Sequence, residues 1–171
     1  MKSNIKLFAI LGFIMLVFNC ATCRYSTNDT SPIPPDITTF HVNTFQNKAR
    51  YVNPQITPQL TDNIKQKIIS QTRLRQINDN IADYDISGYI SDYSITTSGV
   101  ANQQAGTNRL SVTFHLVFKN NVDVSKNFEA DINNNFDFDA KQTLQQAESK
   151  LFSQMIKNIS DAIFNRIFSN W

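Results

Sequence analysis

In the segment RLSVTFHLVF, residues 109–118, every second residue from Leu110 to Phe118 is apolar without a miss. Successive side chains of a β-strand point to opposite faces of a sheet, so this pattern places every second residue on one buried face. The segment therefore predicts a strand with one apolar and one polar side. The five residues of its apolar phase are Leu110, Val112, Phe114, Leu116 and Phe118.

Three other segments carry strand patterns, residues 37–45, 82–95 and 127–133. They are rich in β-branched and aromatic residues that alternate with polar ones. In the second segment the apolar phase slips near Asp92, after which Tyr93 takes the apolar position. A one-residue slip of this kind predicts a β-bulge or a bend. The polar stretch between this strand and the next, residues 96–108, is rich in turn-forming residues and predicts a projecting hairpin loop.

Two segments have apolar residues at the spacing of a helix, 58–73 and about 140–169. Thr57 followed by Pro58 predicts the N-cap and the first helical position of the first helix. The apolar stripe of the second helix is broad, since Phe152, Ile156, Phe164 and Phe168 widen it on one flank. A stripe of this width favours packing against a sheet over packing against a single helix.

The predicted order of elements over residues 37–171 is β-α-β-β-β-α. This order indicates an α+β domain built as a two-layer sandwich, with an about four-stranded sheet and two helices on one face.

The chain begins with two lysines and no acid in residues 1–6, followed by twelve apolar residues, Leu7–Phe18. A short positive region before about 7–15 apolar residues is typical of a secretory signal peptide. A membrane-spanning helix needs roughly 20 apolar residues, so this run is too short to cross comfortably. We interpret residues 1–19 as a signal peptide.

Both cysteines, Cys20 and Cys23, follow the apolar run directly. A redox Cys-x-x-Cys pair belongs at a strand-to-helix turn, and a disulfide across so short a loop would stabilise little. Lipidation is the remaining interpretation, because VFNC resembles the lipobox of bacterial lipoproteins, although Asn19 replaces its usual small residue. Cys20 is favoured as the lipidated residue and Cys23 is the alternative. Residues 20–36, which are rich in proline toward their end, are predicted to form a tether between the lipid and the fold.

Removing residues 1–19 takes two lysines and no acids away, which leaves 14 basic residues (16 minus 2) against 14 acidic ones. Phosphate-backbone binding needs a surplus of Lys and Arg on one face, so nucleic acid is excluded as a predicted partner.

The sequence offers little catalytic chemistry. His41 and His115 fall on the polar side of predicted strands and have no second imidazole or thiol at ligand spacing. Asp83 and Asp85 share one strand face, but no partner acid, base or nucleophile accompanies them. We therefore predict that the protein is not an enzyme and holds no cofactor.

The acidic run at residues 131–139 has oxygen-bearing side chains at alternate positions. An EF-hand loop starting at Asp131 would need Gly at its sixth position and Glu at its twelfth, where the chain has Phe136 and Gln142. We interpret the run as a strand end that leads into a helix start, without a metal.

The segments PIPPDITTFHVNTFQN, NPQITPQLTDNIKQKIISQTRL, ISGYISDYSI, NRLSVTFHLVFKN, KNFEADINNNFDFDA and ISDAIFNRIFSNW, in this order, resemble the LptE family of lipopolysaccharide-assembly lipoproteins. The resemblance covers nearly the whole mature chain and rests on collinearity. It implies an outer-membrane lipoprotein that acts as plug and assembly subunit of the lipopolysaccharide translocon, inside an LptD-type β-barrel. Because no acidic run follows either cysteine, we expect the protein to be lipid-anchored and to face the periplasm.

Lipopolysaccharide is a candidate ligand, for which Arg109 and Lys119 are the candidate phosphate contacts. The alternative for both is an ordinary solvated charge at a strand end. The alternative function is a periplasmic lipid carrier or chaperone lipoprotein without a barrel partner. An apolar cavity lined by Phe114, Phe152 and Met155 would favour that alternative.

Overall fold

The structure is a computed structural model that describes residues 33–51, 53–101 and 104–169, of which 98–101 and 104–105 are described as backbone only. The predicted signal peptide and the two cysteines lie outside the described residues. The elements follow one another as β1 (Thr39–Val42), β2 (Gln46–Asn47), α2 (Ile56–Gln71), β3 (Arg75–Gln76), β4 (Tyr84–Ala101), β5 (Gln104–Asn120), a 3₁₀ turn (Val124–Lys126), β6 (Phe128–Asp139) and α3 (Leu144–Phe168).

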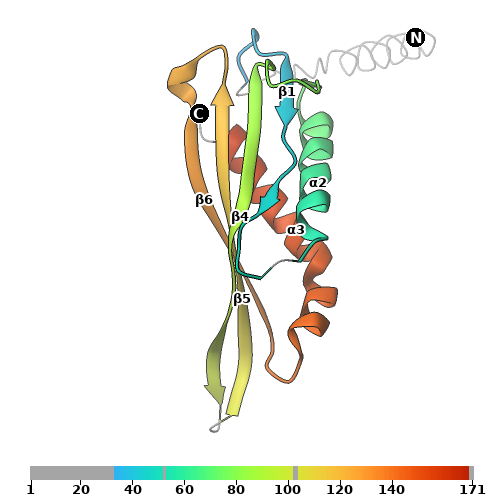
Figure 1. Cartoon of the computed structure of the whole chain (residues 1–171), viewed down its shortest axis with the longest axis vertical. Helices are drawn as coiled ribbons and strands as arrows, with labels where there is room; N and C mark the ends of the chain where they lie inside the picture. Colours follow the sequence, from blue (N-terminus) through green and yellow to red (C-terminus); the bar gives the residue numbers. More distant parts are fainter. Residues whose placement is uncertain (1–32, 52, 102–103, 170–171) are drawn as a thin grey trace, which may run out of the picture. The chain divides into compact units, whose positions relative to one another are not determined.

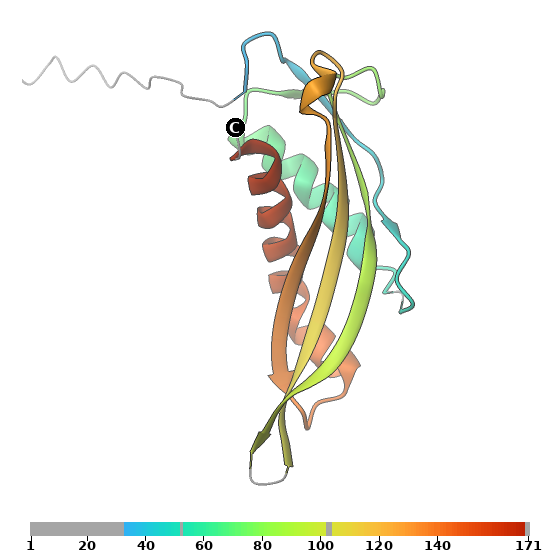
Figure 2. The same ribbon diagram turned by 90° about the vertical axis from the view of Figure 1, so that its left-hand side faces the viewer.

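These elements form a two-layer α+β fold with both helices on one face of a mixed sheet (Figure 1, Figure 2). The strand order is β3-β1-β4-β5-β6, and β2 also pairs with β4. β1 and β2 run parallel to β4, whereas β4, β5 and β6 are antiparallel. The predicted fold class is therefore confirmed. The four predicted strands are present, and β2 and β3 are additions of two residues each that are too short to give a periodic pattern.

The β4–β5 hairpin is longer than the sequence pattern predicted. Its pairing continues to Ala101 opposite Gln104, so most of the predicted loop at 96–108 is strand. The hairpin extends past the end of both helices (Figure 1). Backbone pairing needs no apolar side chain, and the β-branched Thr96 and Thr97 suit extended backbone, which is why the polar composition was misleading here.

The predicted bulge in the strand around Asp92 is confirmed. The β4–β5 register shifts between Ile90 and Asp92, where one extra β4 residue has no partner. Before the shift the buried apolar residues of β4 are the even-numbered Tyr84, Ile86 and Ile90, and after it Tyr93 is buried instead. The bulge thus keeps both halves of a long strand facing the same core.

β6 continues six residues beyond its predicted end at Asn133. It reaches Asp139, with Phe136 and Phe138 buried under the helices. The alternation of apolar and polar residues therefore persists through the run that we interpreted as the approach to a helix. The helix begins only at Leu144.

Helix α2 begins two residues earlier than predicted. Its N-cap is Gln55, which makes no side-chain capping bond, so the predicted cap at Thr57 is wrong. Asn53 Oδ1 instead accepts a hydrogen bond from Gln55 N at 3.0 Å and shapes the entry to the helix. Pro58 is still tolerated because amides of the first helical turn have no intrahelical acceptor.

Helix α3 starts with a capping box that the sequence analysis did not use. Thr143 Oγ1 accepts from Gln146 N, and Gln146 Oε1 accepts from Thr143 N. Its apolar stripe packs on the sheet as expected, and Lys67 of α2 reaches Asp161 of α3 at 2.6 Å. In the described part of the chain, no helix combines the length and the apolar content that a membrane crossing requires.

The last residues of the predicted tether are attached to the domain. Ile33 is only 4% exposed and belongs to the core. Arg73, just after α2, donates from Nη2 to the carbonyl oxygens of Ile33 and Pro34 at 2.8 and 2.5 Å. The chain is therefore fixed to the fold from Ile33 onward.

The core depends on one close approach in β4. A Cβ atom added to Gly88 would lie 2.5 Å from the carbonyl oxygen of His115 and 2.5 Å from the ring of Phe114. The absence of a side chain at Gly88 lets that ring lie across β4 and meet Phe45 edge-on at a centroid distance of 4.8 Å.

We expect Gly88→Ala to lower the free energy of unfolding by about 1–3 kcal/mol, the usual cost of overpacking a core. Urea unfolding followed by circular dichroism measures it. Ser87→Ala, one residue away on the polar face, is the control and should change stability little. Equal stability of the two variants would contradict this account of the core.

Candidate functional site

One face of the sheet is covered by neither of the described helices α2 and α3, and we call it the open face (Figure 2). It is built from the side chains of β4, β5 and β6 that point away from α2 and α3, as the registers and the burial pattern show. Its members are Asp85, Ser87, Tyr89, Asp92, Ser94 and Thr96 of β4, Arg109, Ser111, Thr113, His115, Val117 and Lys119 of β5, and Glu129, Asp131, Asn133, Asn135, Asp137 and Asp139 of β6.

The centre of the open face is a ladder of neutral hydrogen-bonding groups. Ser111 Oγ donates to Asn135 Oδ1 at 2.7 Å, and Asn133 Nδ2 donates to Thr113 Oγ1 at 3.1 Å. Both pairs join residues that lie directly opposite each other on β5 and β6. This surface can offer further hydrogen bonds to a polar partner, and Val117 is the one aliphatic residue among its described members.

Arg109 lies at one end of the open face and is already engaged. Its guanidinium group donates from Nε and Nη2 to the two carboxylate oxygens of Asp137 at 2.7 and 3.0 Å. This side-chain hydrogen bonding and the charge of Asp137 raise the pKa of Arg109, and the same contact lowers that of Asp137. The charge of Arg109 is therefore largely balanced by its cross-strand neighbour.

Lys119 lies at the opposite end of β5 and is exposed. Ten residues of strand separate it from Arg109, which corresponds to about 33 Å. The two predicted phosphate contacts therefore share a face but are not brought together. Among the described residues Lys119 makes no ion pair, so it is the freer of the two cations.

The open face carries more acids than bases. Six of its members are carboxylates, against Arg109 and Lys119 as fixed cations. A surface of this composition attracts cations and repels phosphate groups. The described part of the open face therefore has no cationic cluster that would recognise a phosphorylated lipid.

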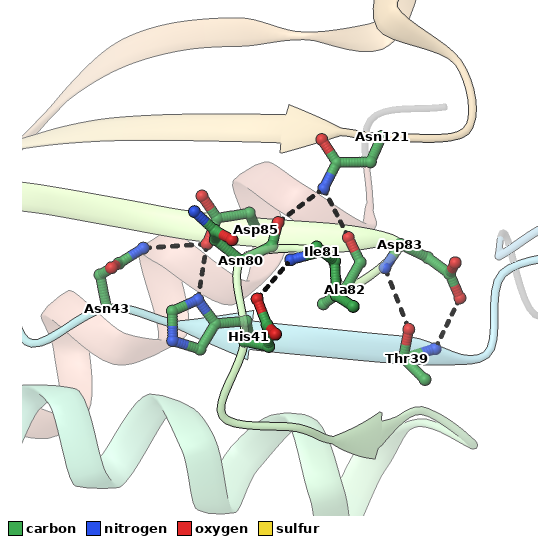
Figure 3. Close-up of polar contacts among 10 residues, drawn as sticks. Thr39, His41, Asn43, Asn80, Ile81, Ala82, Asp83, Asp85 and Asn121 are labelled. Atoms are coloured by element: carbon green, nitrogen blue, oxygen red, sulfur yellow. Dashed lines mark hydrogen bonds and ion pairs between the residues drawn. The ribbon is translucent and has the colours of Figure 1, made fainter.

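At the edge of the open face, β1 is fastened to β4 by side chains that border the strands (Figure 3). Oδ2 of Asp83 accepts hydrogen bonds from the amides of Thr38 and Thr39 at 2.8 and 2.9 Å. In return, Asp83 N donates to Thr39 Oγ1 at 3.0 Å. On the far side of β4, Asn121 Nδ2 donates to the carbonyl oxygen of Ala82 at 2.6 Å.

Asp85 has hydrogen-bond partners different from those of Asp83. Its Oδ1 lies 2.8 Å from His41 Nδ1 and accepts from Asn43 Nδ2 at 2.9 Å (Figure 3). Each aspartate therefore ties its own part of β1 to β4. The carboxylate pair that the spacing suggested is not an acid–base pair, since each member has structural partners.

His115 faces the acidic side of the sheet. Its Nδ1 lies 2.7 Å from Asp131 and its Nε2 lies 3.3 Å from Glu129, and its ring centre is 4.9 Å from that of Tyr89. Both histidines thus lie on the polar side of their strands, as predicted. Their carboxylate partners come from neighbouring strands, so the sequence alone had no means to identify them.

Among the described residues, no group of three or more His, Cys, Asp or Glu side chains is placed to hold a metal ion. The acidic run of β6 explains part of this result. A strand sends its alternate carboxylates along an extended line, whereas a calcium site needs a loop that turns them toward one point.

A buried acid was missed by the sequence analysis. Glu148 is a buried residue of α3, and Tyr93 Oη donates to its Oε1 at 2.5 Å while Tyr51 Oη donates to its Oε2 at 3.2 Å. Burial, followed by the hydrogen bond and the charge of Glu148, raises the pKa of Tyr93. A signal was present, because Glu148 precedes Phe152 and Ile156 at intervals of four on the flank of the α3 stripe.

We expect Asp83→Asn to reduce the loss of stability on acidification. Burial by itself raises the pKa of Asp83, but the hydrogen bonds from Thr38 and Thr39 outweigh it and hold the pKa below the ordinary 3.8. The unfolded chain therefore takes up the proton first. The stability that Asp83 contributes is complete above about pH 4 and is lost as the pH falls through the lower folded pKa.

The measurement is the free energy of unfolding in urea at neutral pH and at several values below pH 4. Asp62→Asn, at an exposed position of α2, is the control. Asp123, Asp137 and Asp161 also have lowered pKa values, so Asp83→Asn removes only part of the slope. If the variant differed from the wild type by the same amount at every pH, the coupling would be absent.

Known protein structures share the fold of this chain. No curated protein sequence matches the chain. Among solved structures, a minor lipoprotein from Acinetobacter baumannii is similar, with a TM-score of 0.53 and 16% identity over 78% of this chain and 94% of that one. An uncharacterized lipoprotein B from Nitrosomonas europaea gives a TM-score of 0.52 and 9% identity over 77% of this chain and 80% of that one. At these identities the two structures support the fold alone.

The family assignment comes from the sequence itself. The family model described as LptE, lipopolysaccharide-assembly, matches residues 37–167, which is most of the chain. The match covers every described helix and strand except the last residue of α3. The chain belongs to the LptE family of lipopolysaccharide-assembly lipoproteins.

Proposed function

We propose that this protein is a plug and assembly subunit of the lipopolysaccharide translocon and that it docks into an LptD-type outer-membrane β-barrel. A lipid on Cys20, or alternatively on Cys23, anchors it to the periplasmic side of the outer membrane. The proposal rests on the family to which the chain belongs. The structure adds one supporting observation, which is the open face.

The open face suits a polar lumen. Barrel interiors are lined by polar side chains, because the apolar ones point outward to lipid. A plug therefore needs a surface that exchanges hydrogen bonds with its walls. The ladder from Ser111 and Thr113 to Asn133 and Asn135 supplies neutral donors and acceptors over the centre of the sheet.

The acids at the margins of the open face indicate the sign of the partner surface. Glu129 and Asp131 are about two-thirds exposed, and the His115 that they share is not a fixed cation. A docking wall with arginine or lysine side chains would complement them. Opposite charges that are aligned in this way contribute mostly to the rate and the specificity of association.

The role that we propose is binding without catalysis. The residues with catalytic side chains in and around the open face, which are Asp83, Asp85, His41 and His115, are each held by neighbouring strands or by the backbone. These contacts give each of the four residues a structural role in holding the strands together.

The carrier alternative receives less support from the core. Phe114 and Met155, two of the residues that would line its apolar cavity, are completely buried in the packed core. Phe152, the third, borders a pocket whose walls are mostly polar. A lipid chain would have to displace core side chains in order to enter between the layers at this point.

We expect Ser111→Trp to reduce the recovery of the barrel about tenfold or more in pull-downs of the lipidated protein from outer membranes. The indole would project from the centre of the open face, and a tenfold loss corresponds to about 1.4 kcal/mol. Ser153→Trp makes the same change at an exposed position of α3 and is the matched control. Thermal unfolding of both variants checks that the fold is retained.

Two results would count against the proposal. Full barrel recovery with Ser111→Trp and loss with Ser153→Trp would place the docking surface on the helices. Recovery of the wild-type protein without any barrel, together with normal surface lipopolysaccharide after depletion, would remove the translocon role itself.

The anchor is tested by mass spectrometry of the mature N-terminal peptide. We expect Cys20→Ser to abolish acylation and to release the protein from the membrane fraction, because a single residue carries the lipid. Cys23→Ser is the matched control and should remain acylated. The reverse outcome would assign the lipid to Cys23, and acylation of neither cysteine would exclude the anchor.

Arg109 and Lys119 remain predicted contacts for lipopolysaccharide phosphates. Asp137 already occupies the guanidinium of Arg109, so Lys119 is the better-placed candidate. Unchanged lipopolysaccharide binding by Lys119→Gln would rule out Lys119 as a phosphate contact.

A further inference from the structure

Glu148 is a charged residue in an enclosed place. It lies in the second turn of α3 and is only 6% exposed. The hydroxyl groups of Tyr93 and Tyr51 each donate to one of its carboxylate oxygens, and the two tyrosine rings stack at a centroid distance of 5.2 Å. Because Tyr51 precedes α2 and Tyr93 belongs to β4, the contact joins three separate parts of the fold.

The carboxylate of Glu148 has no cationic partner among the described residues. A buried charge without a counter-ion is costly, and two neutral hydrogen bonds offset only part of the lost hydration. A carboxylate accepts up to about four hydrogen bonds, so each oxygen of Glu148 has capacity for one more donor. The described residues therefore leave part of the acceptor capacity of the Glu148 carboxylate unused.

Glu148 lines a pocket of about 660 Å³ between α3 and the segment that leads into α2. Its size is in the range of small-ligand and side-chain sites. Glu148 is the only ionisable carboxylate or cation in its described lining. Two aromatic rings and three side-chain amides contribute to the walls, from Tyr51, Phe152, Asn53, Gln55 and Gln145.

We propose that this pocket binds the guanidinium group of an arginine side chain presented by a peptide segment of a protein partner. Three features select this group. The carboxylate supplies the charge, its free lone pairs match the parallel donors of a guanidinium, and the rings of Tyr51 and Phe152 in the wall suit a flat cation that stacks on them. A compact ammonium would use the carboxylate but would leave most of the pocket empty.

The site is distinct from the open face. Glu148 lies on the helix side of the sheet, and the pocket shares no residue with the open face. The inference therefore does not depend on the plug role. A partner with a polar wall against the open face and an arginine-bearing segment in the pocket would contact both sides of the sheet.

The test is a titration of the full-length mature protein in detergent with N-acetyl-arginine methylamide, followed by isothermal titration calorimetry and by tyrosine near-ultraviolet circular dichroism. The matched ligand is N-acetyl-citrulline methylamide, which has the same shape without the charge. We expect the arginine probe to bind at least about tenfold more tightly than the citrulline probe, as one charge-assisted contact provides.

Glu148→Gln should abolish this preference, because it keeps the size and an acceptor for the tyrosines but removes the charge. Glu129→Gln, which changes an exposed acid of β6, should retain the preference and is the control. The melting temperature distinguishes a binding role of Glu148 from a purely structural one. Removing an uncompensated buried charge should leave it unchanged or higher in Glu148→Gln, whereas a structural carboxylate would give a lower value.

A second variant keeps the test decisive if Glu148→Gln does not fold. Gln145→Arg places a guanidinium group three residues before Glu148, on the pocket wall. We expect it to raise the melting temperature and to block the arginine probe. Equal binding of the arginine and citrulline probes, or binding that persists in Glu148→Gln, would overturn the proposal. Tighter binding of ethanolamine than of the arginine probe would overturn it in favour of an ammonium ligand.

Discussion

The antiparallel pairing of β4 with β5 is the interaction on which the rest of the structure depends. It runs from Tyr84 opposite Asn120 to Ala101 opposite Gln104, and the bulge near Asp92 keeps Tyr93 on the same buried side as Ile90. β1 and β2 align on one side of this hairpin and β6 on the other. Because every strand of the open face takes its register from β4 or β5, a slip of one residue would exchange the apolar and polar faces.

The two sides of the sheet differ in whether their charged side chains have partners of opposite charge. On the open face, cross-strand partners balance several of them, as Asp137 does for Arg109. On the helix side, Glu148 is buried with hydrogen bonds but without a counter-ion. Solvent screens the first group, so these pairs contribute little to stability. The second case is the more informative about binding, since burial makes an uncompensated charge expensive to keep.

The misleading sequence signals share one physical cause. The polar stretch at 96–108 and the acidic run of β6 both suggested that strands end, yet each is paired with a neighbouring strand. A strand needs backbone partners more than it needs apolar side chains, and its partner is distant in the sequence. The early start of α2 has a similar origin, since Asn53 and Ile56 shape a turn that the Thr57-Pro58 pattern did not reveal.

The sequence by itself determined the α+β class, the two helices on one face, the bulge near Asp92 and the polar side on which His41 and His115 lie. Those features follow from periodicity, which is local and survives without knowledge of the partners. Only the tertiary structure decided which carboxylates meet His41, His115 and Arg109, that Arg109 and Lys119 lie far apart, and that Tyr51 and Tyr93 enclose Glu148. Each of these contacts joins residues on different elements, and their meeting depends on strand register and on how the helices pack on the sheet.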